Sequence, residues 1–140
     1  MQQPYAGEAT PQQAWSKLAE DSRATLIDVR TPAEWSFVGV ADLSSIGKEP
    51  VLVPWALYPS MEVNASFAQH IAALGLRKDA PLFFMCRSGA RSRAAAIAMT
   101  KQGYTACYNV TTGFEGDKNE AGHRGQFAGW KADGLPWQQG

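Results

Sequence analysis

Four short apolar segments alternate with helical patterns along this chain, and this alternation constrains the fold more than any other feature. The segments span 25–29, 51–53, 81–85 and 106–110. Each is nearly continuous in apolar residues, which is typical of strands covered on both faces. Strands that alternate with helices favour an α/β fold with a mainly parallel sheet, right-handed crossovers and helices on both faces.

The helical patterns between the strands have recognisable start signals and buried stripes. Residues 10–11 and 31–32 both read Thr-Pro, which places a cap residue before a proline at the first helical position. Phe67, Ile71 and Leu74 recur at helical spacing and predict the buried stripe of a further helix. We therefore expect helices that begin at both Thr-Pro pairs and one across 67–74.

The rest of the chain is less regular. A helix of mostly small residues is predicted near 92–102, and a last short helix around Trp130. Residues 36–50 have no clear periodicity and predict a surface loop. Residues 115–129 are rich in glycine and charge, and their conformation is not predicted.

Length and composition bound the class of protein. The chain has 140 residues, 45% of them hydrophobic and 19% charged, so we expect one domain over 1–140 with its core at about 8–137. Thirteen basic and thirteen acidic side chains cancel, which argues against a nucleic-acid or membrane partner. The N-terminus lacks a signal-peptide pattern, so a cytoplasmic protein is expected. No Cys-x-x-Cys or His-x-x-x-His spacing occurs, so neither a metal nor another cofactor is expected.

The segment 86–92, Cys-Arg-Ser-Gly-Ala-Arg-Ser, is the strongest candidate for a functional site. It lies between a predicted buried strand and a predicted helix, where backbone N–H groups and the helix N-terminus favour negative charge. Cys86 is therefore expected to be largely a thiolate, which is the nucleophilic form. The small residues at 88–90 leave the backbone amides of the segment accessible to an anion. The two arginines of the segment are suited to bind an oxyanion.

The same residues also allow other roles for Cys86 than that of a nucleophile. Cys86 could be a small buried core residue, which is common for a free cysteine. Neither His70 nor His123 has a setting that suggests a catalytic base, so a Cys-His hydrolase is disfavoured. Cys107 is predicted to be a buried strand residue, with a resolving-thiol role as the lesser alternative.

On these residues the chain resembles the rhodanese family of sulfurtransferases. The resemblance rests on four sets of residues in chain order, which are 26–30 with 34–35, then 85–92, then 103–104 with 109–110, and finally 130 with 134–136. It implies a sheet of about five mainly parallel strands in a single rhodanese-like domain. It also implies that Cys86 carries sulfane sulfur as a persulfide, taken from a small donor such as thiosulfate and passed to cyanide or a thiol, including a protein thiol.

The resemblance also assigns roles to the neighbouring residues. The amides of the loop would cradle the persulfide, with substrate binding by Arg87, Ser88, Gly89, Ala90 and Arg91. Ser92 would cap the following helix. Asp28, Arg30 and Glu34 are expected to form a structural charge network. Two departures from the family pattern are the longer 36–50 segment and the sequence Thr-Gly-Phe at 112–114, where a double glycine is expected.

Two rival functions stay open at this point. Phosphatases and arsenate reductases of related fold also use a Cys-to-Arg loop, but with five intervening residues, whereas four separate Cys86 from Arg91. The shorter loop suits a single sulfur atom at its centre. The other rival is a non-catalytic sulfur carrier or partner-binding module.

Overall fold

The computed structural model describes residues 5–57, 62–87, 89–116 and 129–138. Its centre is a five-stranded sheet in which every neighbouring pair of strands is parallel. In spatial order the strands are β1 (Gly7–Ala9), β8 (Cys107–Val110), β7 (Leu82–Met85), β2 (Thr25–Asp28) and β4 (Val51–Leu52). The α/β fold predicted from the sequence is confirmed, and the sheet is wholly rather than mainly parallel.

The edge strand β1 has no clear signal in the sequence. It is only three residues long and begins with a glycine, so it lacks the continuous apolar run that marks the other strands. It forms because its backbone pairs with β8, with Glu8 beside Asn109 in register. Tertiary pairing therefore supplies the fifth strand.

Both predicted Thr-Pro helix starts are confirmed. Helix α1 (Pro11–Glu20) is capped by Thr10, and α2 (Pro32–Val38) is capped by Thr31. In each helix the threonine side chain accepts a hydrogen bond from the third helical N–H, and the side chain of that third residue accepts one from the backbone N–H of the threonine. Helix α2 consequently starts at a fixed point just after β2.

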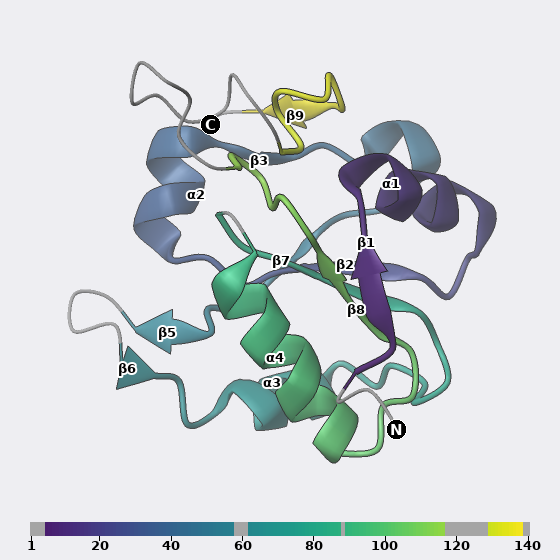
Figure 1. Cartoon of the computed structure of the whole chain (residues 1–140), viewed down its shortest axis with the longest axis vertical. Helices are drawn as coiled ribbons and strands as arrows, with labels where there is room; N and C mark the ends of the chain where they lie inside the picture. The colour runs from purple at the N-terminus through teal and green to yellow at the C-terminus, as the bar shows by residue number, and fades with distance from the viewer. Residues whose placement is uncertain (1–4, 58–61, 88, 117–128, 139–140) are drawn as a thin grey trace.

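Helices cover both faces of the sheet (Figure 1). Helices α3 (Phe67–Ala73) and α4 (Ala90–Lys101) pack on one face, where Ile71 and Met99 join Ile27 and Phe84 of the strands in one buried cluster. Helix α1 packs on the other face, where Leu18 joins a second cluster. None of the described helices has the length and apolar character required to cross a bilayer.

The predicted stripe of α3 is correct at two positions and wrong at the third. Phe67 and Ile71 are buried, but Leu74 is 44% exposed because the helix ends at Ala73 and Leu74 forms its C-cap. The chain then turns at Gly75, whose φ of +70° is favourable for glycine. Leu74 therefore faces the surface at the end of the helix.

The prediction of a surface loop across 36–50 is also wrong in part. Ala41 and Leu43 are buried in the second cluster. Strand β3 (Val40–Ala41) pairs antiparallel with β9 (Trp137–Gln138), and a short 3-10 turn, η1 (Ser44–Ile46), follows. A strand of two residues forms only because it pairs with its partner strand, which lies 96 or more positions away in the sequence.

The expected helix around Trp130 is a series of turns instead. The Trp130 indole N–H donates to the Pro136 carbonyl oxygen at 2.7 Å, and the Trp130 backbone N–H donates to Gly113 at 2.8 Å. The buried indole thus holds the C-terminal segment against the sheet. A separate small ribbon, β5 (Ala56–Leu57) with β6 (Glu62–Val63), leads into α3.

Candidate active site

Cys86 follows β7 directly, at the carboxyl edge of the parallel sheet. This is where α/β folds place their ligand sites. Helix α4 begins at Ala90, two residues earlier than predicted, so the loop between strand and helix is only 86–89. Cys86 is 1% exposed. The sequence predictions for Ser88 and His123 concern residues outside the described ranges.

The conformation of the loop depends on Gly89. Gly89 has φ +115° and serves as the N-cap of α4, and its N–H donates to the Cys86 sulfur at 3.1 Å. A Cβ at this position would lie 2.5 Å from the Thr111 carbonyl oxygen. Both the backbone angle and the available space therefore require glycine, and the result is an N–H group aimed at the sulfur.

Ser92 does not cap α4, contrary to the sequence prediction, because the N-cap residue is Gly89. It is the third residue of the helix and is fully buried, with its Oγ 3.3 Å from the Cys86 sulfur. The same Oγ lies 2.5 Å from Asn109 Oδ1 and 3.2 Å from the Gly89 carbonyl oxygen. Because α4 starts early, Ser92 faces the cysteine rather than the free end of the helix.

A segment after β8 fixes the backbone around Cys86. The Phe114 N–H donates to the Cys86 carbonyl oxygen at 2.8 Å, and the next two N–H groups donate to that of Arg87 at 3.0 and 2.9 Å. Gly113 has φ +65°, and a Cβ on it would come within 2.5 Å of the Cys86 carbonyl oxygen. A single glycine at this place thus permits the close approach.

Arg91 and Glu34 form a two-pronged ion pair that joins α4 to α2. The two nitrogen–oxygen distances are 2.8 and 2.9 Å, and both side chains are about four-fifths buried. Burial raises the pKa of Glu34, but the hydrogen bonds and charge of Arg91, with further hydrogen bonds from Thr31, outweigh it and hold the pKa below the ordinary value. Burial lowers the pKa of Arg91, and Glu34 outweighs this to raise it.

Asp28 and Arg30 form a second, separate pair that is fully buried. Arg30 Nη2 lies 2.7 Å from Asp28 Oδ2 and donates to the Gly39 carbonyl oxygen at the same distance. The guanidinium also lies over the Phe114 ring, 4.2 Å from its centroid. The charged residues expected to form one network are therefore two pairs, one against the Phe114 ring and one between helices α2 and α4.

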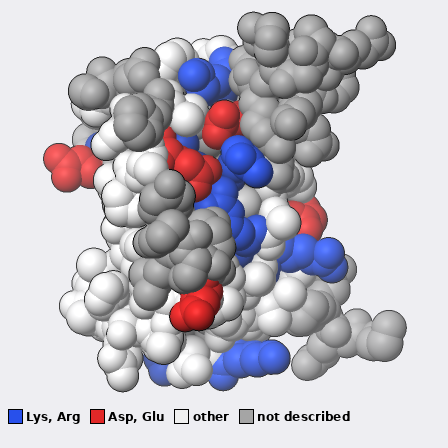
Figure 2. All heavy atoms as spheres, turned by 90° about the vertical axis from the view of Figure 1, so that its left-hand side faces the viewer, with Lys and Arg blue, Asp and Glu red and all other residues white. Residues whose placement is uncertain are grey.

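The remaining predicted residues are at the surface. Arg87 and Ala90 are exposed, and so is His70 on α3. Figure 2 shows a band of basic side chains on the side of the molecule at the left of Figure 1, with acidic side chains close to it. Among the described residues no cluster of three or more His, Cys, Asp or Glu could hold a metal ion.

Three residues of the site were not predicted to belong to it. Gly113 approaches the loop backbone, Asn109 contacts Ser92, and the Asn109 Nδ2 donates to Glu8 Oε2 at 2.8 Å. A polar asparagine within the apolar run 106–110 was a usable signal. Glu8 gave none, because its role follows from the pairing of β1 with β8.

Cys107 has the buried position predicted for it. It lies in β8 with no exposed surface, and desolvation raises the pKa of its thiol to about 11. Both cysteines are free. Cys107 is therefore a protonated core residue at neutral pH.

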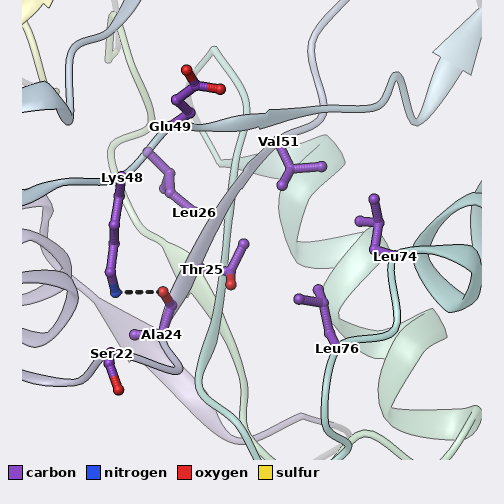
Figure 3. Close-up of a pocket in the computed structure, with 9 residues that line it drawn as sticks. All are labelled: Ser22, Ala24, Thr25, Leu26, Lys48, Glu49, Val51, Leu74 and Leu76. Atoms are coloured by element: carbon purple, nitrogen blue, oxygen red, sulfur yellow. Dashed lines mark hydrogen bonds between the residues drawn. The ribbon is translucent and has the colours of Figure 1, made fainter.

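A pocket of about 340 Å³ lies at the opposite edge of the sheet from Cys86, at the starts of β2 and β4 (Figure 3). Lys48 enters it and donates to the carbonyl oxygens of Asp21 and Ala24 at 2.7 and 2.6 Å. Exposed Leu74 is part of its rim. Lys48 is thus engaged in holding the backbone before β2, and the pocket is remote from the cysteine.

Comparisons with known proteins agree with this arrangement. A family model described as the STR4 middle domain matches residues 6–140. The protein RP600 of Rickettsia prowazekii is 36% identical over 126 residues, which cover 89% of this chain and 91% of that protein. A sulfurtransferase of Allochromatium vinosum is 28% identical over 120 residues, covering 86% and 83% respectively.

Solved structures extend the similarity to three dimensions. The crystal structure of Rv0390 from M. tuberculosis has a TM-score of 0.86 and 51% identity, covering 97% of this chain and 99% of that one. A rhodanese-related protein from Thermoplasma volcanium has a TM-score of 0.56 and 18% identity, covering 96% and 100%. The second similarity concerns the fold alone.

Proposed function

This chain belongs to the rhodanese-like family, and we propose that it is a sulfurtransferase that carries sulfane sulfur on Cys86. The observation that carries the proposal is the Gly89 N–H, which donates to the Cys86 sulfur at 3.1 Å from the start of α4. A donor in this place stabilises negative charge on sulfur. That charge is present on the Cys86 thiolate before it attacks a donor, and it returns to Cys86 when an acceptor takes the outer sulfur.

The proposed reaction has two balanced steps. The Cys86 thiolate attacks the outer sulfur of thiosulfate, a sulfur–sulfur bond forms, and sulfite leaves with the electron pair of the broken bond. An acceptor such as cyanide or a thiol then attacks the outer sulfur of the persulfide. In the cyanide reaction thiocyanate forms and the electron pair returns to Cys86. This is covalent catalysis of the ping-pong type.

The other predicted residues take supporting roles in the proposal. The described amides of the loop, those of Arg87, Gly89, Ala90 and Arg91, cradle the outer sulfur, and exposed Arg87 attracts the anionic donor. Arg91 supplies positive charge whose position Glu34 fixes. Asp28 and Arg30 hold the end of β2 beside the loop. Ser92, in the first turn of α4, places its hydroxyl 3.3 Å from the Cys86 sulfur.

The test is the mass of the intact protein after incubation with thiosulfate. We expect a gain of one sulfur atom, release of one equivalent of sulfite, and loss of the added sulfur as thiocyanate when cyanide is supplied. Cys86→Ala should gain nothing, whereas Cys107→Ala, the matched control at the other cysteine, should behave as the unmodified protein. Absence of the added sulfur on folded protein would refute the proposal.

The same preparation separates the rival functions. Turnover of an aryl phosphate that depends on Cys86 would indicate a phosphatase, which the four-residue spacing to Arg91 disfavours. A protein that gains sulfur but releases none to cyanide or small thiols would be a carrier that serves a protein thiol. A protein that does neither would be a binding module.

A further inference from the structure

A chain of hydrogen bonds leads from the Cys86 sulfur to the edge strand β1. Ser92 Oγ is 3.3 Å from the sulfur and 2.5 Å from Asn109 Oδ1, and Asn109 Nδ2 is 2.8 Å from Glu8 Oε2. The Tyr5 hydroxyl donates to the other oxygen of Glu8. Ser92 and Asn109 are buried, while Glu8, in the edge strand β1, is exposed.

The chemistry of the groups fixes the direction of these bonds. An ionised carboxylate only accepts, so Glu8 requires the NH₂ group of Asn109 to face it. The oxygen of the Asn109 amide must then face Ser92. A carbonyl oxygen also only accepts, so the single hydroxyl proton of Ser92 is taken by Asn109 at the short distance of 2.5 Å.

We propose that Glu8 and Asn109 are positioning residues for the Cys86 sulfur that act through Ser92. They keep the Ser92 hydroxyl donating its hydrogen bond to Asn109 Oδ1. An oxygen lone pair of Ser92, rather than its proton, therefore faces the sulfur. The inference rests on the proposed function, because it concerns how readily the sulfur leaves Cys86.

The predicted consequence is that the persulfide on Cys86 gives up its outer sulfur slowly. When an acceptor takes the outer sulfur, negative charge returns to Cys86, and a hydrogen-bond donor at that atom makes it a better leaving group. The Gly89 N–H is such a donor. The Ser92 hydroxyl is near enough to be a second one, but Asn109 and Glu8 hold its proton elsewhere.

Glu8→Gln tests this without disturbing the core, because Glu8 is exposed. A glutamine can turn its NH₂ toward Asn109, whose amide then reverses and leaves the Ser92 proton free for the sulfur. We expect cyanide to remove sulfur from the loaded variant about fivefold faster in a single turnover, the size expected for one added hydrogen bond. Glu20→Gln, an exposed carboxylate at the far end of α1, should leave the rate unchanged.

A double-mutant comparison separates positioning from a general effect of charge. In a Ser92→Ala background Glu8→Gln should have no effect, and the same should hold in an Asn109→Ala background if Ser92→Ala does not fold. An unchanged or slower release in Glu8→Gln, or an acceleration that persists in both backgrounds, would overturn the inference.

The proposed function can fail independently of this inference. If thiosulfate loads no sulfur on the wild-type protein, the same variants are compared as mixed disulfides of Cys86 with free cysteine. Their cleavage by dithiothreitol also expels the Cys86 sulfur but requires no sulfur transfer. The same fivefold acceleration is expected there, and its absence would reject the positioning role alone.

Discussion

Gly89 determines where the Cys86 sulfur finds a hydrogen-bond donor, although it carries no side chain. Its φ of +115° turns the N–H toward the sulfur, and the nearby Thr111 carbonyl oxygen leaves no room for a Cβ. Backbone donors that stabilise developing charge are worth large factors in rate when they are preorganised. The site thus depends on backbone conformation as much as on charged side chains.

We expect Gly89→Ala to lower the rate of sulfur loading from thiosulfate about 100-fold, because the Cβ must displace the loop and with it the donor that stabilises the attacking Cys86 thiolate. Gly75→Ala is the matched control. Gly75 also has positive φ, at +70°, but an added Cβ meets nothing within 4 Å. Both variants carry backbone strain, so equal loading rates in the two would contradict the role of the Gly89 N–H. Loading is followed by intact mass.

The pair between Glu34 and Arg91 gives a pH-dependent contribution to stability. Because the pKa of Glu34 is lowered on folding, this contribution is complete above the ordinary glutamate pKa of about 4.3. It is lost as the pH falls through the lowered value, where the carboxylate is protonated in the folded protein as well.

Glu34→Gln should therefore lower the free energy of unfolding by about 1–2 kcal/mol at pH 7, and the difference from the wild type should disappear in acid. Glutamine retains an oxygen for the Thr31 cap, so the helix start is preserved. Denaturant unfolding at a series of pH values measures this. A difference that stays constant down to acid pH would show that charge is not the cause.

At the scale of elements, the site is made where three of them meet. Strand β7 delivers Cys86, α4 begins early enough to bring Ser92 to the sulfur, and the segment after β8 binds the backbone carbonyls of 86–87. The contact with that segment requires Gly113, whose Cβ position lies 2.5 Å from the Cys86 carbonyl oxygen.

Gly113→Ala is expected to cost about 2 kcal/mol of unfolding free energy or more and to reduce sulfur loading, since neither backbone can move away freely. Gly47→Ala has a similar φ of +70° but open space around it. It should cost only about 1 kcal/mol, the usual strain of a left-handed residue, and load sulfur normally. Equal losses of stability in both variants would exclude the close contact as the cause.

At the scale of the whole molecule, two buried clusters lie on the two faces of one parallel sheet. Cys107 belongs to the cluster beneath α3 and α4, where its thiol is shielded from water. Burial raises the pKa of this thiol to about 11. Its protonated state is therefore linked to the folded state.

This linkage predicts a loss of stability in alkali. The stabilising effect is complete below the ordinary thiol pKa of about 8.5 and is lost as the pH rises through about 11, because the unfolded chain ionises first. The loss attributable to Cys107 should be about 3 kcal/mol. Cys107→Ala should show a correspondingly shallower decline of unfolding free energy between pH 8 and 11, and parallel declines in both proteins would contradict the prediction.

Much of this molecule follows from local chemistry that can be recognised in the sequence. The apolar runs at 25–29, 51–53, 81–85 and 106–110 correspond to strands β2, β4, β7 and β8, and the Thr-Pro pairs begin α1 and α2. Cys86 was identified because a reactive thiol requires small and basic neighbours within a few residues. These signals are local, so no knowledge of the fold was needed to find them.

Tertiary structure decided the features in which distant residues meet. Strands β1, β3 and β9 are two or three residues long and exist because a partner far along the chain pairs with them. The pairing of β1 with β8 brings Glu8 to Asn109 and hence to Ser92. Leu74 is exposed because α3 ends before it, and Leu43 is buried because it packs in the second cluster. The sequence by itself determined the parallel α/β framework and its candidate nucleophile. The tertiary structure decided that Asn109 and Glu8 join the polar groups near that nucleophile, because their positions depend on the long-range pairing of β1 with β8.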